Sequence, residues 1–222
     1  RVTQSLLDSR LYIADGHHRF RTSCAYRDAC RAKGMGEEPH DFIMMGFVAI
    51  DDPGLVIEPT HRLLKPSGEF DTAAFLQKLA PYFDCERVVD DLPQSVERES
   101  QCAIGFVAPG GRWLLRLHET DRAALLGTDR GPAWRDLDVA VLHRGIIERI
   151  MGWPADTPFA YERDAGKAVA CVENGEYGAA FLLRSPRAEQ IQACAEAGEP
   201  MPHKSTYFFP KLPSGMVLYA LD

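Results

Sequence analysis

Residues 11–21 have the sequence Leu11-Tyr12-Ile13-Ala14-Asp15-Gly16-His17-His18-Arg19-Phe20-Arg21. The first four residues are apolar and predict a short buried strand. Asp15-Gly16 then interrupts the run, because glycine tolerates the sharp turn by which a chain leaves a strand. From His17 onward, apolar residues recur at helical spacing, and Gly34 and Gly36 predict that this helix ends near residue 33. The stretch therefore predicts a strand, a tight turn and a helix in succession.

The first turn of the predicted helix carries an unusual concentration of polar chemistry. Its backbone N–H groups have no partner within the helix, and the helix terminus has a partial positive charge, so the turn suits a phosphate or a carboxylate. Arg19 and Arg21 add fixed positive charge. Asp15 is unexpected beside an anion unless it orients a histidine, holds a metal, or takes a proton from a substrate hydroxyl.

A plainer interpretation fits the same residues. Asp15 then caps the helix, and the histidine and arginine side chains form surface salt bridges. Spacing alone leaves both interpretations open. A metal held jointly by His17 and His18 is disfavoured, because adjacent helical residues point about 100° apart.

Three stretches resemble one known family. Ala14-Asp15-Gly16-His17-His18-Arg19 is similar to the signature of the prokaryotic family known as domain of unknown function 1015. Pro59-Thr60-His61-Arg62-Leu63 resembles a second motif of that family. The segment from Met201 to Lys211, followed by Ser214-Gly215, resembles a third. The core from Asp15 to Arg19 also resembles the phosphate-contacting motif of ParB-like proteins and of the free serine kinases related to them.

The resemblance implies a nucleotide-binding phosphotransferase that uses ATP or ADP with Mg²⁺ and acts on a small hydroxyl compound such as free serine. The candidate catalytic residues are then Asp15, His17 and His18. The candidate phosphate-binding residues are Gly16, Arg19, His61, Arg62, Lys204, Ser205 and Thr206. No residue is assigned as a metal ligand. The alternative is a non-catalytic module that binds a nucleotide or metabolite, as in ParB-like switches, and a fragment without any ligand is a third interpretation.

Composition narrows the class of protein. The formal net charge of −7 argues against broad binding to nucleic acid or to a membrane surface. The sequence has no apolar run of about 18 residues, and it shows no signal peptide, so we expect a cytoplasmic protein whose partner is a small molecule. The six cysteines contain no C-x-x-C pair and are interpreted as reduced thiols. An oligomer is compatible with the sequence.

The remaining segments predict a mixed α/β (α+β) fold, with mixed sheets, flanking helices and the ParB-like motif near the N-terminus. Strands are expected at 42–50, 55–57, 103–107, 113–117 and 178–183, and the first two of these are expected to form a hairpin, as are the next two. Helices are expected after Asp71 and at 136–151, 164–174 and 187–197, with His143 in solvent. Residues 86–101 are expected to be an exposed connection.

We also expect a particular division of the chain. Residues 1–70 are assigned to part of a ParB-like nucleotide-binding region. Residues 71–222 are assigned to an α+β domain whose C-terminal segment returns to the site. Because the chain begins with Arg1 and members of the resembled family carry a substantial region before the first motif, we expect it to be part of a longer protein.

Overall fold

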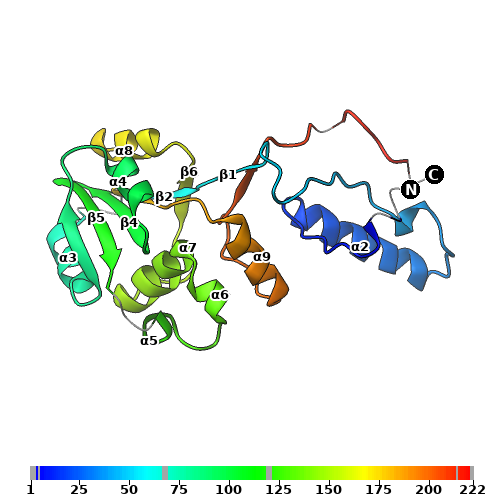
Figure 1. Cartoon of the computed structure of the whole chain (residues 1–222), viewed down its shortest axis with the longest axis horizontal. Helices are drawn as coiled ribbons and strands as arrows, with labels where there is room; N and C mark the ends of the chain where they lie inside the picture. Colours follow the sequence, from blue (N-terminus) through cyan, green and yellow to red (C-terminus); the bar gives the residue numbers. More distant parts are fainter. Residues whose placement is uncertain (1–3, 5, 67–69, 119–121, 214, 221–222) are drawn as a thin grey trace. The chain divides into compact units, whose positions relative to one another are not determined.

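The computed structural model describes residues 4, 6–66, 70–118, 122–213 and 215–220 (Figure 1). The chain forms two compact units. Unit 1 comprises residues 1–56 and 208–222, and unit 2 comprises residues 57–207. The expected nucleotide-binding role of residues 1–70 stays a prediction.

Unit 1 is built on helix α2 (His17–Ala32), which begins directly after Gly16 as predicted. The helix ends at Lys33, and Gly34 follows with φ of +80°, the left-handed backbone that favours glycine. A short 3-10 helix, η1 (Pro39–Asp41), contacts α2. An ion pair of 2.8 Å between Arg31 and Asp41 joins the two helices.

The strand predicted for residues 11–14 is wrong. These residues are extended without strand pairing, and the side chains of Leu11 and Ile13 are 57% and 44% exposed. A strand is stable only beside another strand, and the described part of unit 1 offers none to this segment.

The buried strand predicted for residues 42–50 is also wrong. Phe42 and Phe47 are 58% and 54% exposed, and the segment forms no ladder. Gly46 instead allows the Leu212 side chain to approach the backbone closely, because a Cβ at position 46 would lie 2.6 Å from Cδ1 of Leu212. Strand β1 (Val56–Glu58) is confirmed, but its partner is β8 (Tyr207–Phe209) and not the 42–50 segment.

Unit 2 contains a six-stranded sheet in the order β3-β5-β4-β7-β2-β6, and every neighbouring pair is antiparallel. The predicted hairpin is confirmed as β4 (Ala103–Ala108) and β5 (Gly111–Leu117). The other strands are β2 (His61–Leu64), β3 (Phe83–Arg87), β6 (Phe159–Glu162) and β7 (Ala179–Leu182).

Helices cover both faces of this sheet (Figure 1). Alternate residues of β4 and β7 point to opposite sides, so Phe106 and Phe181 enter one core cluster whereas Val107 and Leu182 enter the other. The larger cluster is covered by α3 (Thr72–Leu79), α5 (Arg122–Leu126), α6 (Pro132–Arg135), α7 (Asp138–Ala140), the π-helix η2 (Val141–Ile150) and α9 (Ala188–Glu196). The smaller is covered by α4 (Leu92–Arg98) and α8 (Ala165–Glu173). The predicted mixed α/β class, with helices flanking a sheet, is confirmed.

The helices predicted from apolar spacing are present as α3, α7 with η2, α8 and α9. The exposed connection predicted for 86–101 is wrong, because α4 lies there and buries Leu92 and Val96 in the core. Two apolar residues one turn apart suffice to anchor a helix when the rest of it faces solvent. Within the described ranges, no helix combines the length and apolar character needed to cross a bilayer.

Candidate functional site

The turn before α2 is built around Gly16. Gly16 occupies the N-cap position with φ of +81°, so the N-cap residue has no side chain that could bond the first-turn amides of the helix. The N–H groups of the first turn therefore remain available to a ligand. The plainer interpretation, in which Asp15 caps the helix, is wrong in detail, because Asp15 Oδ1 accepts a hydrogen bond from the N–H of Gly16 at 2.8 Å.

Arg19 lies over this turn. A Cβ built on Gly16 would meet Nη2, Nε and Cζ of Arg19 at 3.1, 3.2 and 3.3 Å. The guanidinium is thus held close to the start of α2, while its side chain remains 75% exposed. Glycine at position 16 serves two purposes: it permits the left-handed turn, and it leaves room for the guanidinium.

Asp15 is paired with a lysine from the third motif. Nζ of Lys211 donates to Asp15 Oδ2 at 3.1 Å, whereas Arg19 Nη2 lies 4.0 Å from the same oxygen. Partial burial by itself raises the pKa of Asp15, but the hydrogen bonds from Lys211 and Gly16 outweigh it, and the pKa is lowered from its usual value. Asp15 is therefore a carboxylate at neutral pH.

His17, His18 and Arg21 are exposed on α2. The described residues contain no group of three or more histidine, cysteine, aspartate or glutamate side chains placed to hold a metal. One carboxylate is nevertheless a usual protein contribution to a Mg²⁺ ion that is otherwise bound by phosphate oxygens and water. Asp15 fits that donor set, although Lys211 engages one of its oxygens.

Arg62 occupies a different environment in unit 2. Its side chain is fully buried, with Nη1 donating to the carbonyl of Thr60 and Nη2 donating to the carbonyl of His203 at 2.9 Å. Nε donates to Nε2 of His143 at 3.2 Å. Burial lowers the pKa of Arg62 to about 10, so it is charged at neutral pH. The guanidinium lies 5.3 Å from the centre of the Tyr161 ring.

The histidines around Arg62 are held neutral. His61 accepts a hydrogen bond from the Leu183 N–H at its Nδ1, 3.2 Å away. Burial, and secondly the positive charge of Arg62, lower the pKa of both His61 and His143 to about 4. The expectation that His143 lies in solvent is therefore wrong, because its imidazole is turned inward to accept from Arg62.

The third motif follows a bent path. Lys204 has φ of +57° and is exposed, Ser205 is buried and donates to the carbonyl of Pro202, and Thr206 is half-buried. Ser205 lines a cavity of about 190 Å³ together with Thr60 of the second motif. The wall of this cavity also contains Arg184 and Asp138, which form an ion pair of 2.7 Å.

The structure brings the candidate residues together in two groups. Asp15, Gly16 and Arg19 form one group in unit 1, joined by Lys211. His61 and Arg62 belong to the other, in unit 2, where Arg62 binds the third motif through the His203 carbonyl. Phosphate binding by His61, Arg62, Lys204, Ser205 and Thr206 stays a prediction.

The sequence patterns did not assign Lys211 or His143 to the candidate site. Lys211 carried a usable signal, because it belongs to the motif that ends there. His143 carried none, since its partner Arg62 lies 81 positions away in the sequence.

Several solved structures are similar to this chain. A conserved hypothetical protein from Pyrococcus furiosus shares 16% sequence identity with a TM-score of 0.49, over 90% of this chain and 71% of that one. A free serine kinase in complex with AMP shares 14% identity with a TM-score of 0.48, over 88% of this chain and 66% of that one. A mutant free serine kinase in complex with ADP shares 13% identity with a TM-score of 0.48, again over 88% of this chain and 66% of that one. The chain thus spans about two thirds of the kinase chains that it matches.

No curated protein matches the chain. A family match, by contrast, extends over residues 1–140, which include the first two motifs. Since this is more than half of the 222 residues, the chain belongs to the family described as protein of unknown function (DUF1015).

Proposed function

We propose that this protein is a nucleotide-binding phosphotransferase that transfers a phosphoryl group to a small hydroxyl compound of the free serine type. The observation that carries the proposal is the start of α2, where uncapped first-turn amides and the Arg19 guanidinium surround a left-handed Gly16. A helix N-terminus with an adjacent arginine binds phosphate through fixed N–H donors and positive charge. The resemblance of Asp15 to Arg19 to the free serine kinase motif supplies the reaction class.

The first-turn amides, Arg19 and Asp15 have different parts in this proposal. The first-turn amides and Arg19 bind the phosphates of ATP or ADP. Asp15 stays ionised because its pKa is lowered, so it orients the acceptor hydroxyl or shares a Mg²⁺ ion with the phosphates. Such an ion would neutralise phosphate charge. Phosphoryl transfer depends mostly on positioning and electrostatic stabilisation, so an ionised carboxylate with a low pKa suits the site.

In the proposed reaction one bond to phosphorus forms and one breaks. The acceptor oxygen forms a bond to the terminal phosphorus, the bond from that phosphorus to the leaving nucleotide breaks, and the hydroxyl proton is released to solvent or to phosphate. The products are a phosphate monoester and ADP from ATP, or AMP from ADP.

Incubation of the protein with Mg²⁺, free serine and either ATP or ADP tests the proposal, with phosphoserine detected by mass spectrometry. We expect phosphoserine to accumulate with one of the two nucleotides and to fall when Arg19 is replaced by alanine. Nucleotide-induced thermal stabilisation without phosphoserine would favour the non-catalytic binding module. If neither product nor stabilisation appears, the start of α2 is not a nucleotide site.

A further inference from the structure

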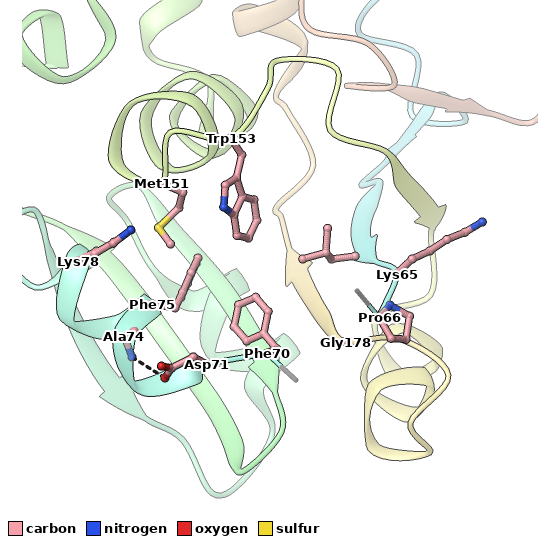
Figure 2. A pocket seen from close by; sticks show the side chains of 11 residues that line it. Lys65, Pro66, Phe70, Asp71, Ala74, Phe75, Lys78, Met151, Trp153 and Gly178 are labelled. Atoms are coloured by element: carbon pink, nitrogen blue, oxygen red, sulfur yellow. Dashed lines mark hydrogen bonds between the residues drawn. The ribbon is translucent and has the colours of Figure 1, made fainter. Parts of the chain in front are cut away.

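A second cavity lies in unit 2, between α3, the segment after η2 and the end of β2. Its volume is about 260 Å³. Figure 2 shows the side chains that line it. Its lining is predominantly apolar or aromatic and includes Phe70, Ala74, Phe75 and Trp153, with Asp71 and Lys78 among its charged residues. None of the lining residues belongs to the three family motifs, although one of them, Leu64, directly follows the second motif.

The aromatic walls are fixed by the core. Phe75 is 1% exposed and stacks on Phe106 with 4.5 Å between ring centres. Phe70 meets Trp153 edge to face, with centres 6.5 Å apart and ring planes at 83°. Rings in this arrangement offer both faces and edges to a further ring. The cavity is therefore suited to a planar apolar group, and its walls are ordered before a ligand arrives.

The charges around the cavity are not balanced. Asp71 is the N-cap of α3 and accepts from the Ala74 N–H at 2.9 Å, so the helix terminus offsets its charge. Lys78, at the other end of α3, forms no ion pair within the described ranges. The two residues are seven positions apart along the helix, or roughly 10 Å, which leaves the Lys78 end of the cavity positive.

Trp153 adds a hydrogen-bond donor at the same end. In Figure 2 the nitrogen-bearing edge of its indole faces the side on which Met151 and Lys78 lie, whereas Lys65 extends away from the cavity. The indole N–H has no acceptor among the residues that the structure describes. An indole N–H only donates, and an ammonium group only donates, so their common complement is an anionic oxygen.

We propose that this cavity binds a small aromatic carboxylate, with the ring against the partly exposed Phe70 and Trp153 and the carboxylate at Lys78 and the indole N–H. Size agrees with this class, because a cavity of about 150 Å³ holds benzene. The volume of about 260 Å³ leaves room for a ring and a short acidic side chain. This site is separate from the start of α2 and does not depend on the proposed phosphotransferase activity.

The test uses 3-phenylpropionate as the probe and 3-phenylpropanol as its neutral counterpart. Calorimetry and tryptophan fluorescence measure binding to the full chain. We expect saturable binding of the acid at a single site and weaker binding of the alcohol by about two- to fivefold, the range of a partly exposed ion pair.

Two variants with matched controls locate the site. Ala74→Leu places a larger side chain in the lining of the cavity and should weaken binding of the acid at least about tenfold. Ala73→Leu, at an exposed position of the same helix that does not line the cavity, should leave binding unchanged. Lys78→Gln should remove the preference for the acid over the alcohol, and Lys167→Gln on α8 should keep it.

Three results would overturn the proposal. The first is an absence of saturable binding by the acid. The second is undiminished binding in Ala74→Leu, because the ligand would then lie elsewhere. The third is equal affinity of the unaltered protein for the acid and the alcohol, which would show that the charge of Lys78 plays no part.

Discussion

The ammonium group of Lys211 donates to the carboxylate of Asp15 at 3.1 Å, although the two residues are 196 positions apart in the sequence. The pair joins the first motif to the last one. The last motif also contains His203, whose carbonyl accepts a hydrogen bond from Arg62 of the second motif. Residues 201–211 therefore have a partner in each of the other two motifs.

Replacement of Lys211 by glutamine should raise the pKa of Asp15 toward its usual value of 3.8. The hydrogen bond from Lys211 is the largest of the contributions that lower this pKa. Carboxyl ¹³C shifts followed by NMR as a function of pH measure the effect. Lys33→Gln is the control, because Lys33 lies at the C-terminal end of α2, whereas Asp15 precedes the N-terminal end. This variant should leave the titration of Asp15 unchanged.

The sign of the associated pH effect follows from the direction of this shift. Because the folded-state pKa of Asp15 is lowered, its contribution to stability is present above the usual value of 3.8 and is lost as the pH falls through the folded-state value. An Asp15 pKa that does not respond to Lys211→Gln would contradict the pairing.

Gly16→Ala and Gly34→Ala form a matched pair at the two ends of α2. Both glycines have φ near +80°, so each alanine should cost about 1–2 kcal/mol of stability. Only at Gly16 would the new Cβ press on the Arg19 guanidinium, since nothing lies within 4 Å at Gly34. Denaturant unfolding should give similar losses for the two variants, whereas ADP calorimetry should show weakened binding for Gly16→Ala alone. Equal ADP affinities would argue against an anion site at this turn.

Arg19→Ala should weaken ADP binding by about three- to tenfold, because one charge-assisted contact to an exposed phosphate is lost. Arg27→Ala on the same helix is the control, since Arg27 pairs with Asp28 at 2.8 Å, away from the first turn. Calorimetry at fixed ionic strength measures both variants. Unchanged affinity in Arg19→Ala would remove the main support for the proposed function.

Arg62→Met should destabilise the protein by about 2–4 kcal/mol. The substitution removes the donor from the carbonyls of Thr60 and His203 and from Nε2 of His143, and the Thr60 carbonyl is then buried without a partner from this side chain. Arg144→Met, which breaks a more exposed ion pair with Asp129, should cost less than about 1 kcal/mol. Denaturant unfolding measures the free energy of unfolding of both variants. A loss as small as that of Arg144→Met would mean that the buried network contributes little.

His143→Gln should make stability less dependent on pH. The folded-state pKa of His143 is lowered to about 4 from the usual 6.5, so the neutral imidazole stabilises the fold above 6.5, and that stability is lost as the pH falls from there through 4. Glutamine keeps an acceptor for the Arg62 guanidinium but does not titrate in this range. Thermal melting between pH 4 and 7 should show a shallower slope for the variant. A slope equal to that of the unaltered protein would place the titration elsewhere, for example on His61, whose pKa is also lowered to about 4.

Sequence patterns predicted the elements whose signals are local. The start of α2 follows from Asp15-Gly16, and the hairpin of β4 and β5 follows from two apolar runs around Pro109-Gly110-Gly111. The helix expected after Asp71 is α3, and the Asp71 side chain caps it. In each case the residues that determine the structure are neighbours in the chain.

The failures come from segments whose structure depends on distant partners. Residues 42–50 are as apolar as a central strand, but a strand also needs neighbours, and Gly46 instead accommodates Leu212. β1 pairs with β8 from the other end of the chain, a choice that no local pattern indicates. The same limit applies to the candidate site, since the partners of Asp15 and Arg62 lie in the last motif.

The strand order has a consequence for shortened versions of this protein. The family match ends at residue 140, but β2 touches only β6 and β7 in the sheet, and both follow that residue. A truncation at residue 140 would remove β7, the strand that lies between β2 and β4. It would also remove Phe181, whose ring stacks on that of Phe106. The family match is thus shorter than the smallest piece that can complete the six-stranded sheet, and expression trials need to extend at least through Leu183.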